Sequence, residues 1–395
     1  MKVSQRSAVP PFAVMQIIAA ANARRAAGQD VINLCAGEPV TGASDAVRER
    51  AREFLDGRSL GYTEALGAPL LRAALAAHYE RWYGIDVDPA RIAVTTGSSG
   101  GFMLAFLAAF DVGDRVALVR PGYPAYRNIL GSLGCEVVEL AAGADVGHAP
   151  TPAMLDAAHA DAPLAGLVLA SPANPTGTMI DADRLAGLAA WCAAHDVRLV
   201  SDEIYHGIVH DPSRWPGATA AHHLGTGAVV VSSFSKYWAM TGWRLGWLLL
   251  PEDLLAPVDA LAGNVALCPP ALAQHAAVAA LEPDGYAAAA RDAEQYGRSR
   301  AVLLARLDEL GWHDVAPADG AFYLYADVST SGLDSRDWCA RLLDEAGVAL
   351  TPGTDFDPVD GHRWVRLSFA QEPATITTAV DRIVAWQKTL ASCGR

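Results

Sequence analysis

The architecture of this chain can be inferred outward from the stretch RIAVTTGSSGG, residues 91–101. Three of its first six residues are apolar and four are β-branched, which is typical of a strand. Glycine and serine follow as a turn, and the apolar residues after them predict a helix from about Ser99 to Phe110. A strand that turns directly into a helix is the repeating unit of sheets that are covered by helices.

The rest of the chain continues this alternation. Further strands are predicted at residues 115–119, 166–170, 198–202, 229–232 and 245–250, with helices after Pro124 and over residues 182–195. Short apolar strands between helices indicate a buried, mostly parallel sheet. After about Pro270 the chain is first helical and then predicts strands at 321–325, 348–350 and 364–368 and a helix at 334–345. We therefore expect an α/β protein with a large domain (residues 46–275), a smaller α+β domain (276–395), and residues 1–45 as an N-terminal arm and part of the small domain.

The composition restricts the possible functions. A formal net charge of −14 argues against binding to nucleic acids or anionic membranes, which requires a basic surface. The six cysteines are widely spread, so neither a disulfide framework nor a zinc cluster is indicated. The apolar run from Phe12 to Ala21 is interrupted by Gln16 and predicts an arm helix rather than a signal peptide. No apolar run reaches the roughly 18 residues of a membrane span, and we expect a soluble, cytoplasmic protein.

Lysine is rare in this chain, which contains only Lys2, Lys236 and Lys388. Lys2 and Lys388 lie near the ends, whereas Lys236 lies in the middle of the chain. A primary amine can lose its proton and form an imine, which a guanidinium cannot do. Lys236 is therefore the candidate for amine chemistry, although an isolated lysine on its own is more often a surface residue.

Polar residues stand where the predicted strands end. They are Thr96 to Gly101, Tyr123, Asn174, Asp202 with Tyr205, and Ser233 to Lys236. In open α/β sheets, ligands bind beyond the carboxyl ends of the strands. We therefore expect these side chains to converge on one crevice.

These groups match the chemistry of pyridoxal 5′-phosphate (PLP). Gly97, Ser98 and Ser99 offer N–H groups and hydroxyls at a helix N-terminus, where a phosphate binds well. Asp202, at a buried strand end, needs a partner such as a protonated pyridine nitrogen, which keeps the ring an electron sink. Arg244 offers a forked donor for the phosphate.

Five more residues offer contacts to the same cofactor. Asn174 and Tyr205 are candidates to hydrogen-bond the phenolic oxygen, and Tyr123 is a candidate to stack on the ring. Ser233 and Ser235 place hydroxyls near the lysine. Each of these residues alone has an ordinary structural explanation, such as a turn at Asn174 or core packing of Tyr123.

Several motifs in one order then carry a resemblance to a known family. The segment SFSKYWAMTGWRLGW, residues 233–247, is similar to the PLP-lysine signature of the class I and II aminotransferases. The resemblance extends over nearly the whole chain through VINLCAGEP (31–39), YTEALG (62–67), ANPTG (173–177), SDEIY (201–205), GAFYL (320–324) and VRLSF (365–369). It implies PLP fold type I, as in aspartate aminotransferase, with a mostly parallel seven-stranded sheet sandwiched by helices and a smaller α+β domain.

The resemblance also implies a role for each matching residue. Lys236 would bind PLP as a Schiff base and transfer protons, with Asp202 on the pyridine nitrogen and Tyr205 on the phenolic oxygen. The residues that would hold PLP are Gly97, Ser98, Ser99, Tyr123, Asn174, Asp202, Tyr205, Ser233, Ser235, Lys236 and Arg244, with Tyr62 reaching the neighbouring active site of a homodimer. Arg366 would bind the substrate α-carboxylate, with help from Gly37 and Asn174.

The implied activity is transfer of an amino group from an L-amino acid to a 2-oxo acid, by a ping-pong mechanism through pyridoxamine phosphate. The segment from Ser98 to Gly101 has no cation for a distal carboxylate. This favours a neutral or aromatic amino acid, with 2-oxoglutarate or pyruvate as acceptor. Aromatic residues are candidate pocket walls, namely Phe12, Tyr62, Tyr123, Trp238 and Phe322.

Other functions remain open at this stage. A PLP-dependent lyase, cyclase or oxidase would share the same cofactor residues. A non-catalytic PLP-fold module is a remote alternative. A nicotinamide dehydrogenase is disfavoured, because no GxGxxG motif follows a strand. We expect no metal site, since the adjacent His222 and His223 have no third ligand at a suitable spacing.

Overall fold

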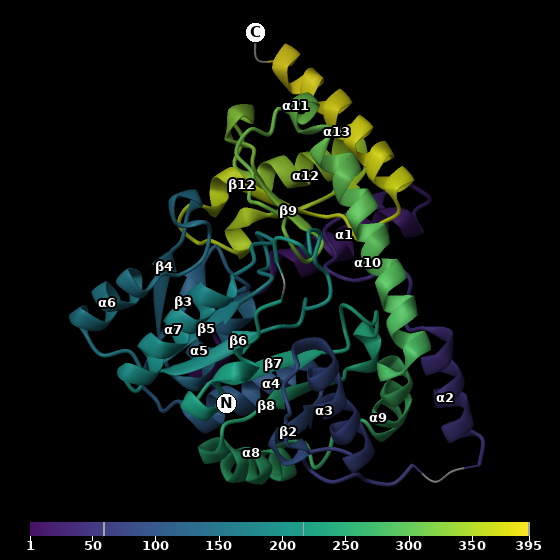
Figure 1. Ribbon diagram of the computed structural model, residues 1–395. Coiled ribbons are helices and arrows are strands. Elements are labelled where there is room, and N and C mark those ends of the chain that lie inside the picture. Colours follow the sequence, from purple (N-terminus) through teal and green to yellow (C-terminus); the bar gives the residue numbers. More distant parts are fainter. Residues whose placement is uncertain (58–59, 216, 394–395) are drawn as a thin grey trace.

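The computed structural model describes residues 1–57, 60–215 and 217–393 and confirms the predicted α/β architecture (Figure 1). Its centre is a seven-stranded sheet of order β2-β8-β7-β6-β5-β3-β4. The strands are β2 (Ile92–Thr95), β3 (Arg115–Arg120), β4 (Glu136–Ala141), β5 (Gly166–Ala170), β6 (Arg198–Asp202), β7 (Val229–Ser233) and β8 (Gly246–Leu249). Only β8 runs antiparallel to its neighbours, so the sheet is mostly parallel.

Helices cover this sheet because its strands are apolar on both faces. All side chains of β2, β7 and β8 are buried. The helices that accompany the sheet are α2 (Asp45–Leu55), α3 (Pro69–Tyr83), α4 (Gly97–Ala109), α5 (Pro124–Leu133), α6 (Pro152–Asp161), α7 (Ala182–Ala194), α8 (Glu252–Val265) and α9 (Ala271–Ala277). Their boundaries follow local chemistry: Asp181 caps α7 through the Arg184 N–H, and Gly84 ends α3 in a left-handed conformation.

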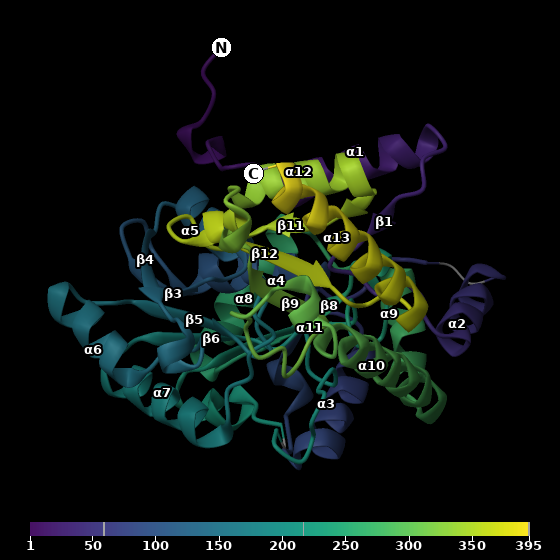
Figure 2. The same cartoon turned by 90° about the horizontal axis from the view of Figure 1, so that it is seen from above.

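A second, smaller α+β unit lies over the carboxyl ends of the six parallel strands (Figures 1 and 2). Its antiparallel sheet has the order β11-β12-β9, formed by β9 (Tyr323–Asp327), β11 (Thr351–Pro352) and β12 (Trp364–Ser368). Its helices are α10 (Pro283–Leu304), α11 (Leu307–Leu310), α12 (Ser335–Ala346) and α13 (Pro373–Cys393). Helix α10 runs along one side of the molecule from the large unit to the small one (Figure 1).

The N-terminal segment belongs structurally to the small unit. Helix α1 (Ala13–Ala26) leads to β1 (Ile32–Asn33), which pairs in parallel with β10 (Val348–Ala349). In Figure 2 the residues before α1 extend away from the body of the protein. The division of the chain at residues 45/46 and 275/276 stays a prediction.

Two further observations concern the chain as a whole. Within the described residues, no helix combines the length and the apolar character that crossing a bilayer requires. The five cysteines whose side chains are described carry free thiols, namely Cys35, Cys135, Cys192, Cys268 and Cys339.

Candidate cofactor and substrate site

Lys236 lies just beyond the end of β7 and directs its amine at the loop that follows β1. Its Nζ donates a hydrogen bond of 2.5 Å to the carbonyl oxygen of Gly37. Burial lowers the pKa of Lys236 to about 8, and the positive charge of Arg366 contributes to this shift. An amine with such a pKa is partly neutral near neutral pH, so it is able to act as a nucleophile and as a base.

Asp202 ends β6 and is almost completely buried, with 3% of its surface exposed. Its carboxylate accepts hydrogen bonds from the Tyr126 hydroxyl and, at 3.0 Å, from the Ile204 N–H. Burial raises the pKa of Asp202 to about 6, against the effect of these two donors. A nearby N–H cation would therefore stabilise the ionised carboxylate, as a protonated pyridine nitrogen does.

Three residues from distant segments meet on the small-domain side of this site. The hydroxyls of Tyr205 and Tyr323 lie 2.7 Å apart, and both side chains are buried. Gly37 passes so close to the Tyr323 hydroxyl that a Cβ atom at position 37 would collide with it. Glycine at position 37 thus allows the loop after β1 to approach Tyr323 and Lys236 together.

Arg366 lies on β12 and is 4% exposed. Its Nη1 donates to Asn174 Oδ1 and its Nη2 to the carbonyl oxygen of Cys35, both at 2.8 Å. The rings of Tyr323 and Phe356 lie 4.4 and 4.7 Å from the guanidinium carbon.

This guanidinium has unused binding capacity. Among the described residues, no acidic side chain forms an ion pair with Arg366, and its Nε has no hydrogen-bond partner. A buried cation without a carboxylate partner is costly unless a ligand supplies one. The forked geometry of arginine suits a carboxylate that binds through both oxygens.

The N-terminus of α4 and Arg244 form an anion-binding cradle. Arg244 is exposed, adopts a left-handed conformation with φ of +52°, and donates from Nη1 to the Thr241 carbonyl at 2.9 Å. A Cβ atom at Gly97 would collide with the Arg244 guanidinium, and one at Gly246 would lie 2.8 Å from the Ser98 nitrogen. The two glycines therefore bring the guanidinium against the first turn of α4, where no side chain caps the N–H groups.

The other residues that were predicted to bind the phosphate or to lie near the lysine are serines at the end of β7 and the start of α4. Ser233 and Ser235 are buried, and the Ser235 N–H donates to the Ser233 hydroxyl at 3.1 Å. Ser98 is half-buried and Ser99 is exposed. Ser233 lies opposite Gly246 in the sheet register, which places the β7 end beside the cradle.

Tyr123 precedes α5 and lies between two other aromatic rings. Its ring is nearly parallel to that of Phe12, with an interplanar angle of 10° and a centroid distance of 6.4 Å. It meets Tyr126 edge-on at 5.4 Å. The charges of Asp202, Arg366 and Arg244 all influence the raised pKa of Tyr123, whose first cause is burial. Because Tyr126 contacts both Tyr123 and Asp202, Tyr123 lies in the same crevice as Asp202.

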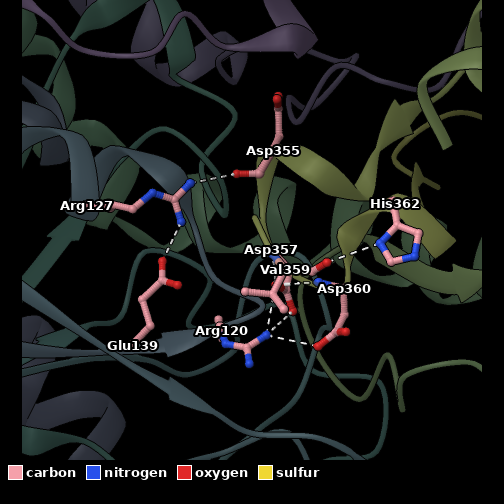
Figure 3. A network of polar contacts seen from close by, with 8 residues as sticks. All are labelled: Arg120, Arg127, Glu139, Asp355, Asp357, Val359, Asp360 and His362. Atoms are coloured by element: carbon pink, nitrogen blue, oxygen red, sulfur yellow. Dashed lines mark hydrogen bonds and ion pairs between the residues drawn. The ribbon is translucent and has the colours of Figure 1, made fainter. Parts of the chain in front are cut away.

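Ion pairs of Arg120, which precedes Tyr123 by three residues in the sequence, join the two units (Figure 3). Nη1 of Arg120, the last residue of β3, lies 3.0 Å from both Asp357 Oδ1 and Asp360 Oδ2. The Gly122 N–H donates to the carbonyl oxygen of Phe356 at 3.0 Å. These contacts hold the segment before β12 against the loop that carries Tyr123.

Asp355 extends the same network to the N-terminal helix (Figure 3). Its carbonyl oxygen accepts a 3.4 Å hydrogen bond from Arg127, which also pairs with Glu139 at 2.9 Å. Its carboxylate accepts from the N–H groups of Ala13 and Val14 at 3.0 and 2.9 Å. Asp355 thus caps α1 and places Phe12, the residue before this helix, beside Tyr123.

The structure brings nearly all predicted site residues into one crevice, and it adds two that the sequence reasoning missed. Tyr126 lies one helical turn beyond Tyr123, and this spacing indicates that the two side chains lie on the same face of α5. Tyr323 stands within the GAFYL motif, next to Phe322, which was predicted as a pocket wall. Tyr62 is the exception, since it is 84% exposed on the surface of the chain.

The donor set fits PLP. The cradle of α4 and Arg244 suits the phosphate, the Asp202 carboxylate suits the pyridine nitrogen, and the Lys236 amine suits the aldehyde. The unpaired Arg366 guanidinium suits the carboxylate of an amino-acid substrate.

Comparisons with known proteins agree with this geometry. The family model described as aminotransferase class I and II matches residues 29–383. A valine–pyruvate aminotransferase of Mycobacterium tuberculosis is 51% identical over 385 residues, 98% of each chain. An aspartate/prephenate aminotransferase of Thermus thermophilus is 35% identical over 95% of this chain and 96% of its own.

Solved structures agree as well. The crystal structure of an aminotransferase from Mycobacterium tuberculosis superposes with a TM-score of 0.95, with 51% identity over 98% of this chain and 100% of that one. Aspartate aminotransferase from Thermus thermophilus with maleate gives a TM-score of 0.90, with 32% identity over 98% of this chain and 99% of that one. The chain therefore belongs to the class I and II aminotransferases and is a PLP-dependent transaminase that uses amino acids and 2-oxo acids.

Proposed function

We propose that this enzyme transfers the amino group of a neutral amino acid of the valine class to a 2-oxo acid such as pyruvate, by a ping-pong mechanism. The identity to the valine–pyruvate aminotransferase supports this choice of substrates. The structural observation that supports an α-amino acid as substrate is the buried Arg366, which offers a site for the carboxylate that all α-amino acids share.

The side-chain part of the pocket supports a neutral substrate. Arg120 and Arg127, which flank Tyr123 in the sequence, are already held by Asp357, Asp360 and Glu139. The first turn of α4 contributes hydroxyls but no cation. Neither these two arginines nor the first turn of α4 therefore offers a distal carboxylate a free cation, and burial of an unpaired carboxylate is unfavourable.

Each residue of the site would have its own role in the reaction. Bound PLP supplies an aldehyde that exchanges amino groups and a ring that stabilises negative charge. Arg366 would hold the substrate carboxylate, with the Asn174 NH2 group left free to donate because its Oδ1 already accepts from Arg366. Lys236 Nζ would remove the proton from the substrate α-carbon and return it to the cofactor carbon. Asp202 would keep the pyridine nitrogen protonated, and Tyr205 would donate to the phenolic oxygen.

The test is a half-reaction. Purified enzyme with PLP is titrated with single amino acids in the absence of any 2-oxo acid, and the absorbance spectrum is recorded. We expect valine and related neutral amino acids to convert the PLP band to that of pyridoxamine phosphate, with one 2-oxo acid formed per site. Conversion by aspartate but not valine would refute the substrate assignment. Release of ammonia or of a cleaved side chain would support a lyase or oxidase instead.

We further propose a homodimer in which Tyr62 reaches the phosphate of the neighbouring active site. Tyr62 is 84% exposed, and the exposed apolar residues Leu70, Val265 and Leu267 support a buried contact in the assembled protein. An apolar hollow lies between α4 and the end of α8 and is lined by Ala65, Met103, Leu104, Val265 and Pro269. Sedimentation analysis tests the dimer directly.

The compartment and the domain division complete the proposal. Free thiols in the described part of the chain support the cytoplasm, where thiols stay reduced. We propose residues 46–275 as the large domain and 276–395, with part of 1–45, as the small domain. Limited proteolysis, with cleavage near residues 45 and 275, tests this division.

A further inference from the structure

Gln274 on α9 is completely buried, with 0% of its surface exposed, and it joins two separate loops. Its Oε1 accepts a 2.7 Å hydrogen bond from the Ala68 N–H. Its Nε2 donates to the Thr63 hydroxyl at 3.0 Å and to the Pro269 carbonyl oxygen at 2.9 Å. Both ends of the amide are therefore used between the segment 63–68 and the loop before α9.

The segment 63–68 is a tight turn packed against the edge strand β2. The Gly67 N–H donates to the Glu64 carbonyl oxygen at 2.9 Å, and the Val94 N–H donates to the Leu66 carbonyl oxygen at 2.9 Å. Gly67 has φ of +95°, and a Cβ atom there would lie 3.1 Å from Gln274 Oε1 and collide with Val94. The turn therefore has one arrangement, defined jointly by β2 and Gln274.

Tyr62 stands directly before this turn. Its neighbour Thr63 is anchored by Gln274, whereas the Tyr62 ring itself is 84% exposed. An exposed aromatic side chain on an anchored backbone is pre-organised to contact something outside its own chain. The apolar hollow lined by Ala65 and Pro269 lies beside the 63–68 turn, because Gln274 binds both this turn and the Pro269 carbonyl oxygen.

We propose that Gln274 is a positioning residue for the neighbouring active site: it holds the 63–68 turn so that Tyr62 meets the cofactor phosphate bound by the partner subunit. This inference rests on the proposed homodimer. It has a specific consequence, since Gln274 then acts in trans. Loss of its amide disturbs the active site of the partner subunit and leaves the site of its own chain intact.

Mixed dimers test this consequence. Two differently tagged chains are co-expressed, and the dimers that carry both tags are isolated. One chain carries Lys236→Ala, so only the other chain binds PLP covalently through its lysine and gives the corresponding absorbance band. Gln274→Leu, which removes all three hydrogen bonds at similar volume, is placed either on the Lys236→Ala chain or on the intact chain.

The PLP dissociation constant of the intact site is then measured by titrating the cofactor-free dimers. With Gln274→Leu on the Lys236→Ala chain, we expect it to rise about 10-fold, the effect of losing one charge-assisted hydrogen bond. With Gln274→Leu on the intact chain, we expect it to stay unchanged. An equal or larger effect in the second arrangement, or no effect in either, overturns the proposal.

Controls separate this inference from the proposal on which it rests. Gln295→Leu is the matched control, because Gln295 is also buried but its Nε2 has no partner within the described chain. If Gln274→Leu does not fold, Gln274→Glu keeps the acceptor for Ala68 and loses both donors. A monomer in sedimentation analysis refutes the dimer itself. A trans effect of Tyr62→Phe without one of Gln274→Leu refutes the role of Gln274 alone.

Discussion

The Tyr126 hydroxyl donates a hydrogen bond to Oδ2 of Asp202, 76 positions further along the chain. Among the described residues, this bond is one of two that the buried carboxylate accepts. It lowers the pKa of Asp202 against the raising effect of burial. Tyr126 therefore helps to keep Asp202 ionised, which the proposed contact with a pyridinium nitrogen would require.

Tyr126→Phe removes this donor and little else. The pKa of Asp202 then rises further above about 6, and we expect the acidic limb of the kcat/KM profile to move to higher pH. At neutral pH we expect kcat/KM to fall roughly 10-fold, the effect of one hydrogen bond to a charged group. Tyr79→Phe is the control, because the Tyr79 hydroxyl bonds to Trp247 instead. An unchanged acidic limb in Tyr126→Phe would contradict this role.

Asp202 also predicts how the stability of the cofactor-free enzyme depends on pH. Its pKa in the folded protein, about 6, lies above the ordinary value of 3.8. The folded protein therefore binds this proton more tightly than the unfolded chain does, and the free energy of unfolding falls as pH rises from about 4 to about 6. The Asp202 contribution to this fall is about 3 kcal/mol.

Asp202→Asn carries no titrating group, so the variant is expected to lack this part of the pH dependence. Urea unfolding midpoints of both cofactor-free proteins between pH 4 and 7 provide the measurement. The midpoint of the wild-type protein should drop relative to that of the variant as pH rises. Parallel curves would show that burial of this carboxylate does not determine its protonation.

Arg366 is predicted to act on the substrate rather than on the cofactor. Arg366→Lys keeps the charge but loses the forked donor, and we expect kcat/KM for the amino acid to fall about 100-fold, or about 3 kcal/mol. The PLP dissociation constant should stay within about twofold. An equal loss of cofactor and substrate binding would show that Arg366 acts mainly through its bonds to Asn174 and Cys35.

Much of the fold could be predicted because the central strands are short apolar runs that end at polar residues. Strands β5, β6 and β12 have the predicted bounds. Strand β4, residues 136–141, was not predicted. It lies at the sheet edge and carries Glu136 and Glu139, which interrupt the apolar signal. The antiparallel direction of β8 is a tertiary feature that local patterns do not contain.

The site shows the same division. Lys236, Asp202 and Arg366 stand in motifs whose order along the chain resembles a known family, so the sequence predicts a role for each of them. The contact between Tyr205 and Tyr323 spans 118 positions, and no local periodicity encodes such a pairing. The contact of Asp355 with the start of α1 spans more than 340 positions and was likewise not predictable.

Asp355 gives the last prediction, because its carboxylate accepts from both Ala13 and Val14 at the start of α1. Asp355→Ala removes this cap, which costs about 1 kcal/mol for a helix N-terminus. Phe12 is then no longer held beside Tyr123, and the proposed substrate pocket would lose one of its predicted walls. We expect KM for valine to rise several-fold while kcat changes little, since the cap does not contact Lys236 or the phosphate cradle.

Asp360→Ala is the matched control for this variant. It removes one of the two carboxylates that bind Arg120 in the same segment and leaves the α1 cap intact. KM should therefore respond to Asp355→Ala and much less to Asp360→Ala. Equal increases in both variants would assign the effect to the contact between the two units. A fall in kcat without a change in KM would show that Phe12 does not line the substrate pocket. Loss of a pocket wall is expected to weaken substrate binding and so to raise KM.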